Sequence, residues 1–142
     1  MPLIGGKASA QIPWFQTVPR IVLGTVFAAA AINYFWECAW GRALFCVPVT
    51  DRGMQFAGMI IRAGYLWPLM KLINLTAGTL LIANRAPAFA LALLVPITVV
   101  IVWFQLILNP LPMPLATVAL VVGCELLLAR TYAARYCPMF DR

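Results

Sequence analysis

Four long stretches of the chain are almost entirely apolar, and short polar or proline-rich segments separate them. They cover about residues 19–40, 65–83, 87–108 and 113–130. A helix rises about 1.5 Å per residue, so about 20 residues cross the roughly 30 Å hydrocarbon core of a bilayer. We therefore predict an all-α membrane protein in which each of these stretches crosses the membrane as a helix.

A shorter segment between the first two stretches has a different pattern. Residues 54–64 place Phe56, Met59, Ile60 and Ala63 at the spacing of one helix face. The segment is too short to span a bilayer, which favours a short amphipathic helix lying at the membrane interface. The predicted fold is a four-transmembrane-helix bundle with this interfacial helix between helices 1 and 2, forming a single domain over residues 1–142.

Composition supports a membrane location and removes several kinds of chemistry. The chain is 64% hydrophobic and 10% charged, whereas ordinary soluble domains are about 45–50% apolar and about 25% charged. It contains no histidine, which argues against His-ligated haem, His-based zinc sites and a Ser-His-Asp mechanism. We expect no metal site and no cofactor bound covalently or through histidine. A quinone or a lipid remains open as a ligand.

The basic residues stand mostly at the ends of the apolar stretches. This placement is typical of the positive-inside rule and not of nucleic-acid binding, although the net charge is +6. With four spans, both termini and the second loop share one side. That side carries Lys7, Arg20, Arg85, Arg130, Arg135 and Arg142, and the other side carries Arg42, Arg52 and Arg62. We predict a multi-pass protein of a bacterial-type inner membrane with both termini in the cytoplasm.

Two charged residues within the apolar stretches are expected to meet. Glu37 and Lys71 lie at similar depths, and an ionised group in hydrocarbon costs at least a few kcal/mol without a partner. The pair is either a structural link between helices or, with Arg62 and Asn74 nearby, an intramembrane polar site. Such a site would suit a quinone head group, a proton or a small anion.

Glu125 has a different expected environment. It sits four residues from the cytoplasmic end of the fourth stretch, some 10–15 Å nearer the cytoplasm than Lys71. We expect it to face Arg130, Arg85 or cytoplasmic water.

Aromatic residues and cysteines gather near the outer ends of the first two stretches. Tyr34, Trp36 and Trp67 suit an interfacial aromatic belt, or a surface on which a quinone or pigment ring stacks. Cys38 and Cys46 bracket the start of the first outer loop. They could form a disulfide in an oxidising periplasm or stay free.

Several apolar motifs, taken together, resemble DoxX-like integral membrane proteins. The resemblance covers about residues 17–136 and rests on PRIVLGTVF (Pro19–Phe27), AGYLWPLMKLINLTAGTLLI (Ala63–Ile82), RAPAFALALLVPI (Arg85–Ile97) and ARTY (Ala129–Tyr132). It implies a compact four-helix bundle and a link to membrane redox or thiol-stress assemblies. Lys71 matches the family pattern. Members often carry an acidic residue where this chain has Asn74, so the resemblance transfers no proton or quinone site.

The sequence favours a non-catalytic integral membrane subunit that anchors, organises or stabilises a larger respiratory, photosynthetic or redox complex. Expected partners are the bilayer and other membrane subunits, and no nucleic acid. Whether it is an enzyme stays open, although an accessory subunit is favoured because no nucleotide loop or histidine ligand is present. Alternatives are a quinone-linked oxidoreductase subunit, with Glu37, Lys71 and Arg62 around the head group, and a small oligomeric transporter.

Overall fold

The computed structural model describes residues 14–140, and for residues 134–140 it describes the backbone alone. Every regular element in this part of the chain is helical, which confirms the predicted all-α class. The elements are α1 (Trp14–Trp40), α2 (Asp51–Arg62), α3 (Leu66–Ile82), α4 (Pro87–Trp103), a π-helical segment η1 (Phe104–Leu108) and α5 (Pro112–Phe140). Lys7, Arg142 and the side chain of Arg135, which enter the charge argument, lie outside the described residues.

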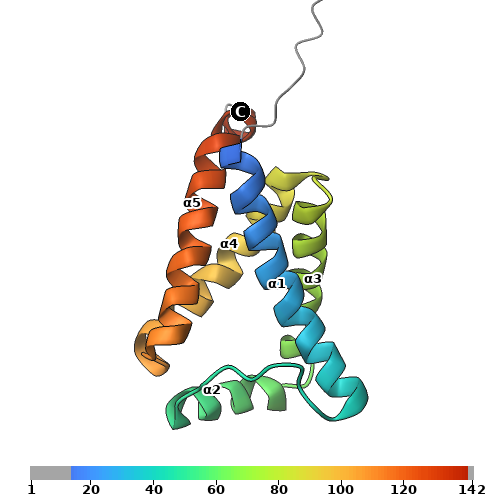
Figure 1. Cartoon of the computed structure of the whole chain (residues 1–142), viewed down its shortest axis with the longest axis vertical. Coiled ribbons are helices and arrows are strands. Elements are labelled where there is room, and N and C mark those ends of the chain that lie inside the picture. The colour runs from blue at the N-terminus through green and yellow to red at the C-terminus, as the bar shows by residue number, and fades with distance from the viewer. Residues whose placement is uncertain (1–13, 141–142) are drawn as a thin grey trace, which may run out of the picture.

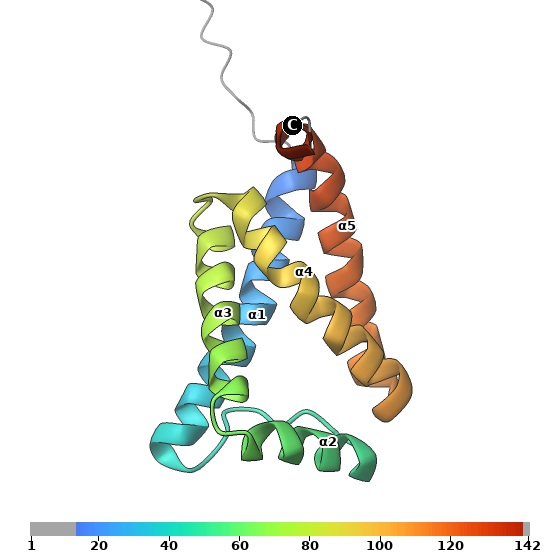
Figure 2. The same cartoon turned by 180° about the vertical axis from the view of Figure 1, so that it is seen from behind.

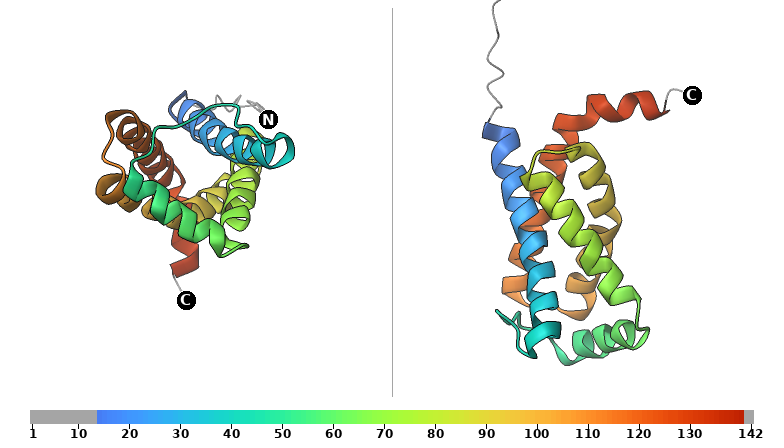
Figure 3. Two further views of the ribbon diagram at one scale, coloured as in Figure 1. Left: turned by 90° about the horizontal axis from the view of Figure 1, so that it is seen from below. Right: turned by 90° about the vertical axis from the view of Figure 1, so that its right-hand side faces the viewer.

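Four of the helices run along one long axis and the fifth lies across them. Helices α1, α3, α4 and α5 form the bundle, and α2 lies across one end of it (Figure 1). The start of α1, the α3–α4 turn and the end of α5 share the opposite end, as the view from behind also shows (Figure 2). The last turns of α5 bend away from the bundle axis (Figure 3). The chain therefore passes four times between two ends, as the spacing of apolar stretches predicts.

Three of these helices are long and apolar enough to cross a membrane. They cover Trp14–Trp40, Pro87–Leu108 and Pro112–Ala133. The consecutive helices α2 and α3 pass the same test together but bend by 95° between them. The described part of the chain thus offers three spans, or four when the bent pair contributes one.

Helices α1 and α2 each begin at an earlier residue than the sequence predicts. Helix α1 begins at Trp14 and not at residue 19, so Pro19 lies inside its second turn and removes one backbone hydrogen bond, to the carbonyl of Phe15. Helix α2 begins at Asp51, three residues before the predicted start, because the hydroxyl of Thr50 accepts a hydrogen bond from the Gly53 N–H.

Two glycines allow the turns at the α2 end of the bundle. Gly41 follows α1 with φ of 70° and donates its N–H to the carbonyl of Glu37. Gly64 has φ of 79° and lies at the bend between α2 and α3. Residues with a side chain rarely adopt these angles. Gly64 therefore lets α2 lie across the bundle while α3 runs along it.

The tightest helix contact joins α1 and α3. A Cβ atom placed on Gly24 would lie 2.9 Å from the carbonyl oxygen of Gly78, and one on Gly78 would lie 2.8 Å from that of Gly24. Small residues allow this approach, as in many membrane helix pairs. The surrounding core is aliphatic, and its fully buried members include Leu23, Leu81, Leu91, Leu94 and Leu128. From this contact α1 and α3 move apart toward the α2 end (Figure 3).

Candidate functional site

A cavity of about 210 Å³ lies between the helices in the half of the bundle nearer α2. Helices α1 and α5 diverge toward that end (Figure 1), and the cavity occupies the space that this divergence leaves. Its walls are mostly aliphatic and aromatic, and include Phe27 of α1, Ile101 and Val102 of α4, and Val121 of α5. A cavity of about 150 Å³ with apolar walls is enough to hold benzene. This one therefore has room for a ring with a polar group.

Two polar side chains of α3 line the cavity. Lys71 and Asn74 are three residues apart, so they share one face of the helix. Asn74 is 3% exposed, and its Oδ1 has no hydrogen-bond partner. The Nζ of Lys71 lies 5.2 Å from the centroid of the Trp67 ring, a cation–π contact. The cavity thus combines a cation with an unsatisfied amide oxygen.

Helix α4 supplies a third polar group, and this group is already bonded. The Thr98 hydroxyl, which lines the cavity, donates to Oε1 of Glu125 at 2.6 Å. Both residues are buried, and Glu125 is 8% exposed. The prediction that Glu125 faces Arg130, Arg85 or water is therefore wrong. From its position along the helix we expected Glu125 near the cytoplasmic end. It lies, however, on the face of α5 that points toward α4.

The loop between α1 and α2 contributes Val47 to the cavity wall, and Asn109 holds this part of the loop in place. We call residues 47–50 the strap. The Oδ1 of Asn109 accepts from the Thr50 N–H at 2.9 Å, and its Nδ2 donates to the Pro48 carbonyl at 3.3 Å. The same Nδ2 donates to Oε1 of Gln105 at 2.7 Å. The Thr50 hydroxyl donates in addition to the carbonyl of Leu108. Val47 of the strap then lines the cavity.

The mouth of the cavity reaches the molecular surface beside the strap. Val47 and Met113 both line the cavity, and they are 47% and 62% exposed. They come from the strap and from the first turn of α5. The cavity is therefore partly open to the surface near these two residues.

The structure brings together only part of the predicted polar site. Lys71 and Asn74 line the cavity, whereas Glu37 and Arg62 are exposed and do not. Glu37 lies near the end of α1, and no ion pair joins it to Lys71 in the described part of the chain. Similar depth did not bring the two together, because the side chain of Glu37 is exposed whereas that of Lys71 lines the cavity.

The predicted stacking residues make contacts with other aromatic or charged groups. Trp36 stacks on Trp40 with ring centroids 4.2 Å apart, and Tyr34 meets Phe35 edge-on at 5.4 Å. Trp67 contacts Lys71 but is not part of the cavity wall. Stacking of a ligand ring on these three residues stays a prediction.

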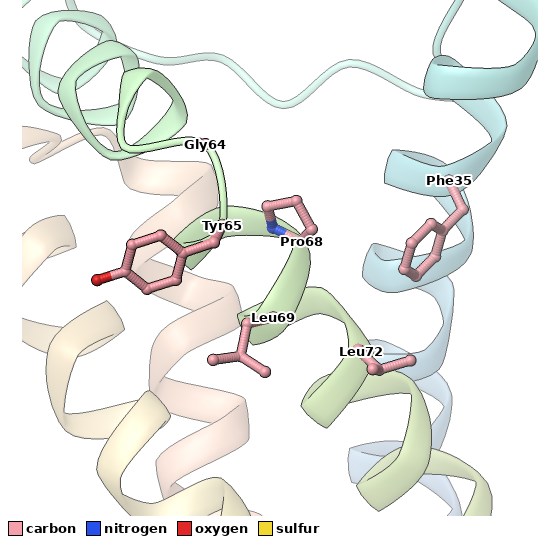
Figure 4. A pocket seen from close by; sticks show the side chains of 6 residues that line it. All are labelled: Phe35, Gly64, Tyr65, Pro68, Leu69 and Leu72. Atoms are coloured by element: carbon pink, nitrogen blue, oxygen red, sulfur yellow. The ribbon is translucent and has the colours of Figure 1, made fainter.

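A second hollow lies on the outer surface near the bend between α2 and α3. Figure 4 shows it between Phe35 of α1 and Tyr65, Pro68 and Leu72 around the start of α3. Its lining is almost entirely apolar and it is open. This shape suits a lipid chain lying against the bundle, and the Tyr65 hydroxyl is the one polar side-chain group among its lining residues.

The cysteines whose side chains the structure describes do not gather into a metal site. Cys38 and Cys46 are free and exposed, and Cys124 is buried among apolar side chains. The disulfide between Cys38 and Cys46 stays a prediction. Among the described residues, no three His, Cys, Asp or Glu side chains lie close enough to hold a metal ion together.

The sequence did not single out two buried residues of this region, or one buried residue near the start of α1 at the opposite end of the bundle. Asn109 is completely buried but lies in a proline-rich turn, where an asparagine is usually attributed to the turn itself. Nothing in the sequence distinguished Thr98 as a site residue, because threonine is common in apolar helices. Arg20 was assigned to the membrane surface, yet it is 6% exposed and its Nε has no partner.

Comparisons with protein-family models, with curated proteins and with solved structures give no match for this chain. The resemblance to DoxX-like proteins stays a prediction. Functional inference therefore rests on the geometry of the bundle.

Proposed function

We propose that this chain is a multi-pass membrane protein that binds a small molecule inside its own helix bundle. In this proposal α1, α3, the α4–η1 helix and α5 each cross the membrane, and α2 lies at one interface. The apolar outer faces support it, since residues such as Phe89, Val99, Trp103 and Leu127 are more than half exposed. Lipid is the solvent that such surfaces fit.

The observation that carries the binding proposal is the cavity around Lys71 and Asn74. Buried polar groups are normally hydrogen-bonded, and an ionisable group within a membrane helix usually marks a site of function. Here a cation and an unsatisfied amide line the same space, and that space has a mouth. A bound molecule could pair with Lys71, and one that carries an O–H or N–H group could also satisfy Asn74.

We place this binding protein within a larger membrane complex as a non-catalytic subunit, of respiratory, photosynthetic or redox kind. Among the described residues, the cavity lining contains no carboxyl, thiol or imidazole group, so the amine of Lys71 has no acid–base partner in the lining with which to carry a reaction. Binding and positioning are the roles that its groups can perform. Both termini would face the cytoplasm and α2 the opposite side.

The experiment compares two neighbouring alanines of α1. Ala30 lines the cavity and Ala29 does not, so Ala30→Leu fills the cavity while Ala29→Leu adds the same volume outside it. The full chain is purified in mild detergent and examined by native mass spectrometry for bound chains and small molecules. We expect a larger assembly in all variants, with a retained small molecule that Ala30→Leu loses and Ala29→Leu keeps. A lone chain, or equal retention in both variants, would contradict the proposal.

A quinone-linked oxidoreductase subunit is a second candidate, favoured by one feature of the lining. Lys71 and Gln105 reach the cavity from different helices, and each could donate a hydrogen bond to one carbonyl oxygen of a quinone. Lys71→Met should then abolish quinone-dependent turnover of the assembly while leaving its composition intact. Unchanged turnover would dispose of this candidate.

A further inference from the structure

Positive charge outweighs negative charge inside the bundle. Lys71 lines the cavity and Arg20 is buried, whereas Glu125 is the single carboxyl group buried in the described part of the chain. Glu125 is bonded to Thr98, and neither cation forms an ion pair with it. A buried cation without an anion is costly, and a ligand can supply the missing charge.

The position of Lys71 makes the cavity the place for that charge. Its partner among the described residues is the face of Trp67, and a cation–π contact replaces only part of the lost hydration. One helical turn away, the Oδ1 of Asn74 lacks a donor. A ligand with a negative charge and also an O–H or N–H group would pair with Lys71 and donate a hydrogen bond to Asn74. An anion without such a donor would pair with Lys71 only.

The rest of the cavity wall favours a ligand that has an apolar part. Phe27, Ile101, Val102 and Val121 surround the polar pair. An inorganic anion would leave this volume of about 210 Å³ largely empty or filled with water, and apolar cavities tend to exclude water. A ring or a short alkyl segment would fill it, and a longer tail could leave through the mouth beside Val47 and Met113.

We infer that the cavity binds the carboxylate of an organic acid with an apolar body, paired with the ammonium group of Lys71. This inference rests on the proposed function and names the class of ligand for the same site. The acid is either a free small molecule, such as an aromatic carboxylate, or a fatty acid released from lipid. Both sources present the same chemistry, a monoanion joined to an apolar group.

The test uses benzoate, its neutral isostere benzamide, and palmitate as the lipid-derived acid. Binding to the purified full chain in detergent is measured by titration calorimetry, with Ala30→Leu as the reference for nonspecific partitioning. We expect benzoate or palmitate to bind at least tenfold more tightly than benzamide, and Lys71→Met to lose this preference. Arg62→Met removes an exposed cation outside the cavity and should behave as wild type. Binding of palmitate without benzoate would identify lipid as the source.

A second variant keeps the test independent of whether Lys71→Met folds. Asn74→Asp is nearly the same size and places a carboxylate beside Lys71, so it should weaken benzoate binding much more than benzamide binding. Equal binding of benzoate and benzamide to wild type would overturn the inference and leave a cavity for neutral ligands. Binding of benzoate to Asn74→Asp as tightly as to wild type would also overturn it. If Ala30→Leu binds every probe as wild type does, the proposed function itself fails.

Discussion

The side chain of Asn109 accepts a hydrogen bond from the backbone N–H of Thr50 at 2.9 Å, and so joins residues 59 positions apart. Asn109 sits in the turn between η1 and α5, and Thr50 caps the start of α2. Because Asn109 also bonds Pro48 and Gln105, one buried amide holds the strap beside the cavity. This contact fixes both the position of α2 and the shape of the site.

Asn109→Ala should destabilise the protein by about 1–3 kcal/mol, because it leaves the Thr50 N–H without a partner in a partly buried place. Unfolding in detergent, followed by circular dichroism, measures the change. Gln55→Ala is the matched control, since Gln55 is an exposed amide on α2 and its loss should cost less than about 0.5 kcal/mol. Equal effects for the two variants would show that the strap is not held as described.

Gly78→Ala should force α1 and α3 apart. The added Cβ would lie 2.8 Å from the Gly24 carbonyl oxygen and 3.0 Å from the Ala28 nitrogen, and overpacking of this kind costs about 1–3 kcal/mol. Gly123→Ala serves as the control, because nothing lies within 4 Å of the position its Cβ would take. In a helix interior that change is expected to stabilise by about 0.5–1 kcal/mol. The same unfolding measurement compares them, and a neutral Gly78→Ala would refute the close contact.

Thr98→Val should leave the buried carboxyl of Glu125 without its donor, at a cost of about 1–3 kcal/mol. Thr98→Ser keeps the hydroxyl and should restore most of that loss. Thr76→Val is the control, because the exposed Thr76 hydroxyl bonds the Leu72 carbonyl of its own helix. The double variant Thr98→Val with Glu125→Leu should cost less than the sum of its single variants. Additive effects would mean that the two residues do not interact.

Labelling of Cys38 and Cys46 tests the proposed orientation. Both thiols are exposed at the α2 end of the bundle, which we place on the outer side of the membrane. In intact cells, with Cys137 replaced by Ser, a membrane-impermeant maleimide should label both, and Cys124 should stay unlabelled. Labelling that requires a reductant first would indicate the predicted disulfide. Labelling that requires permeabilised cells would reverse the orientation.

The sequence predicted the helices well because their signal is local. Runs of apolar residues set the positions of α3, the α4–η1 helix and the first part of α5, and the spacing of Phe56 and Ile60 indicated α2. Helix α1 starts earlier than predicted because it tolerates Pro19 near its start. Helix α2 starts earlier because the Thr50 side chain caps it. The π-helical segment η1 left no recognisable pattern in the sequence.

The site was only partly predictable, because depth along a helix does not fix the direction in which a side chain points. Lys71 and Asn74 were both recognised as polar residues within an apolar stretch, and both line the cavity. Glu37 was paired with Lys71 by depth, yet it is exposed. Glu125 turned inward to Thr98. These outcomes depend on the crossing of helices, which apolar periodicity alone does not specify.

An experimental density map of the full chain in lipid nanodiscs would test the existence of an internal binding site most directly. The region to inspect lies between Lys71, Asn74 and Phe27. We predict continuous non-protein density there, in contact with the Lys71 ammonium group and too large for separate waters. A cavity closed by side chains, or one that contains isolated water peaks alone, would contradict the binding function proposed for this protein.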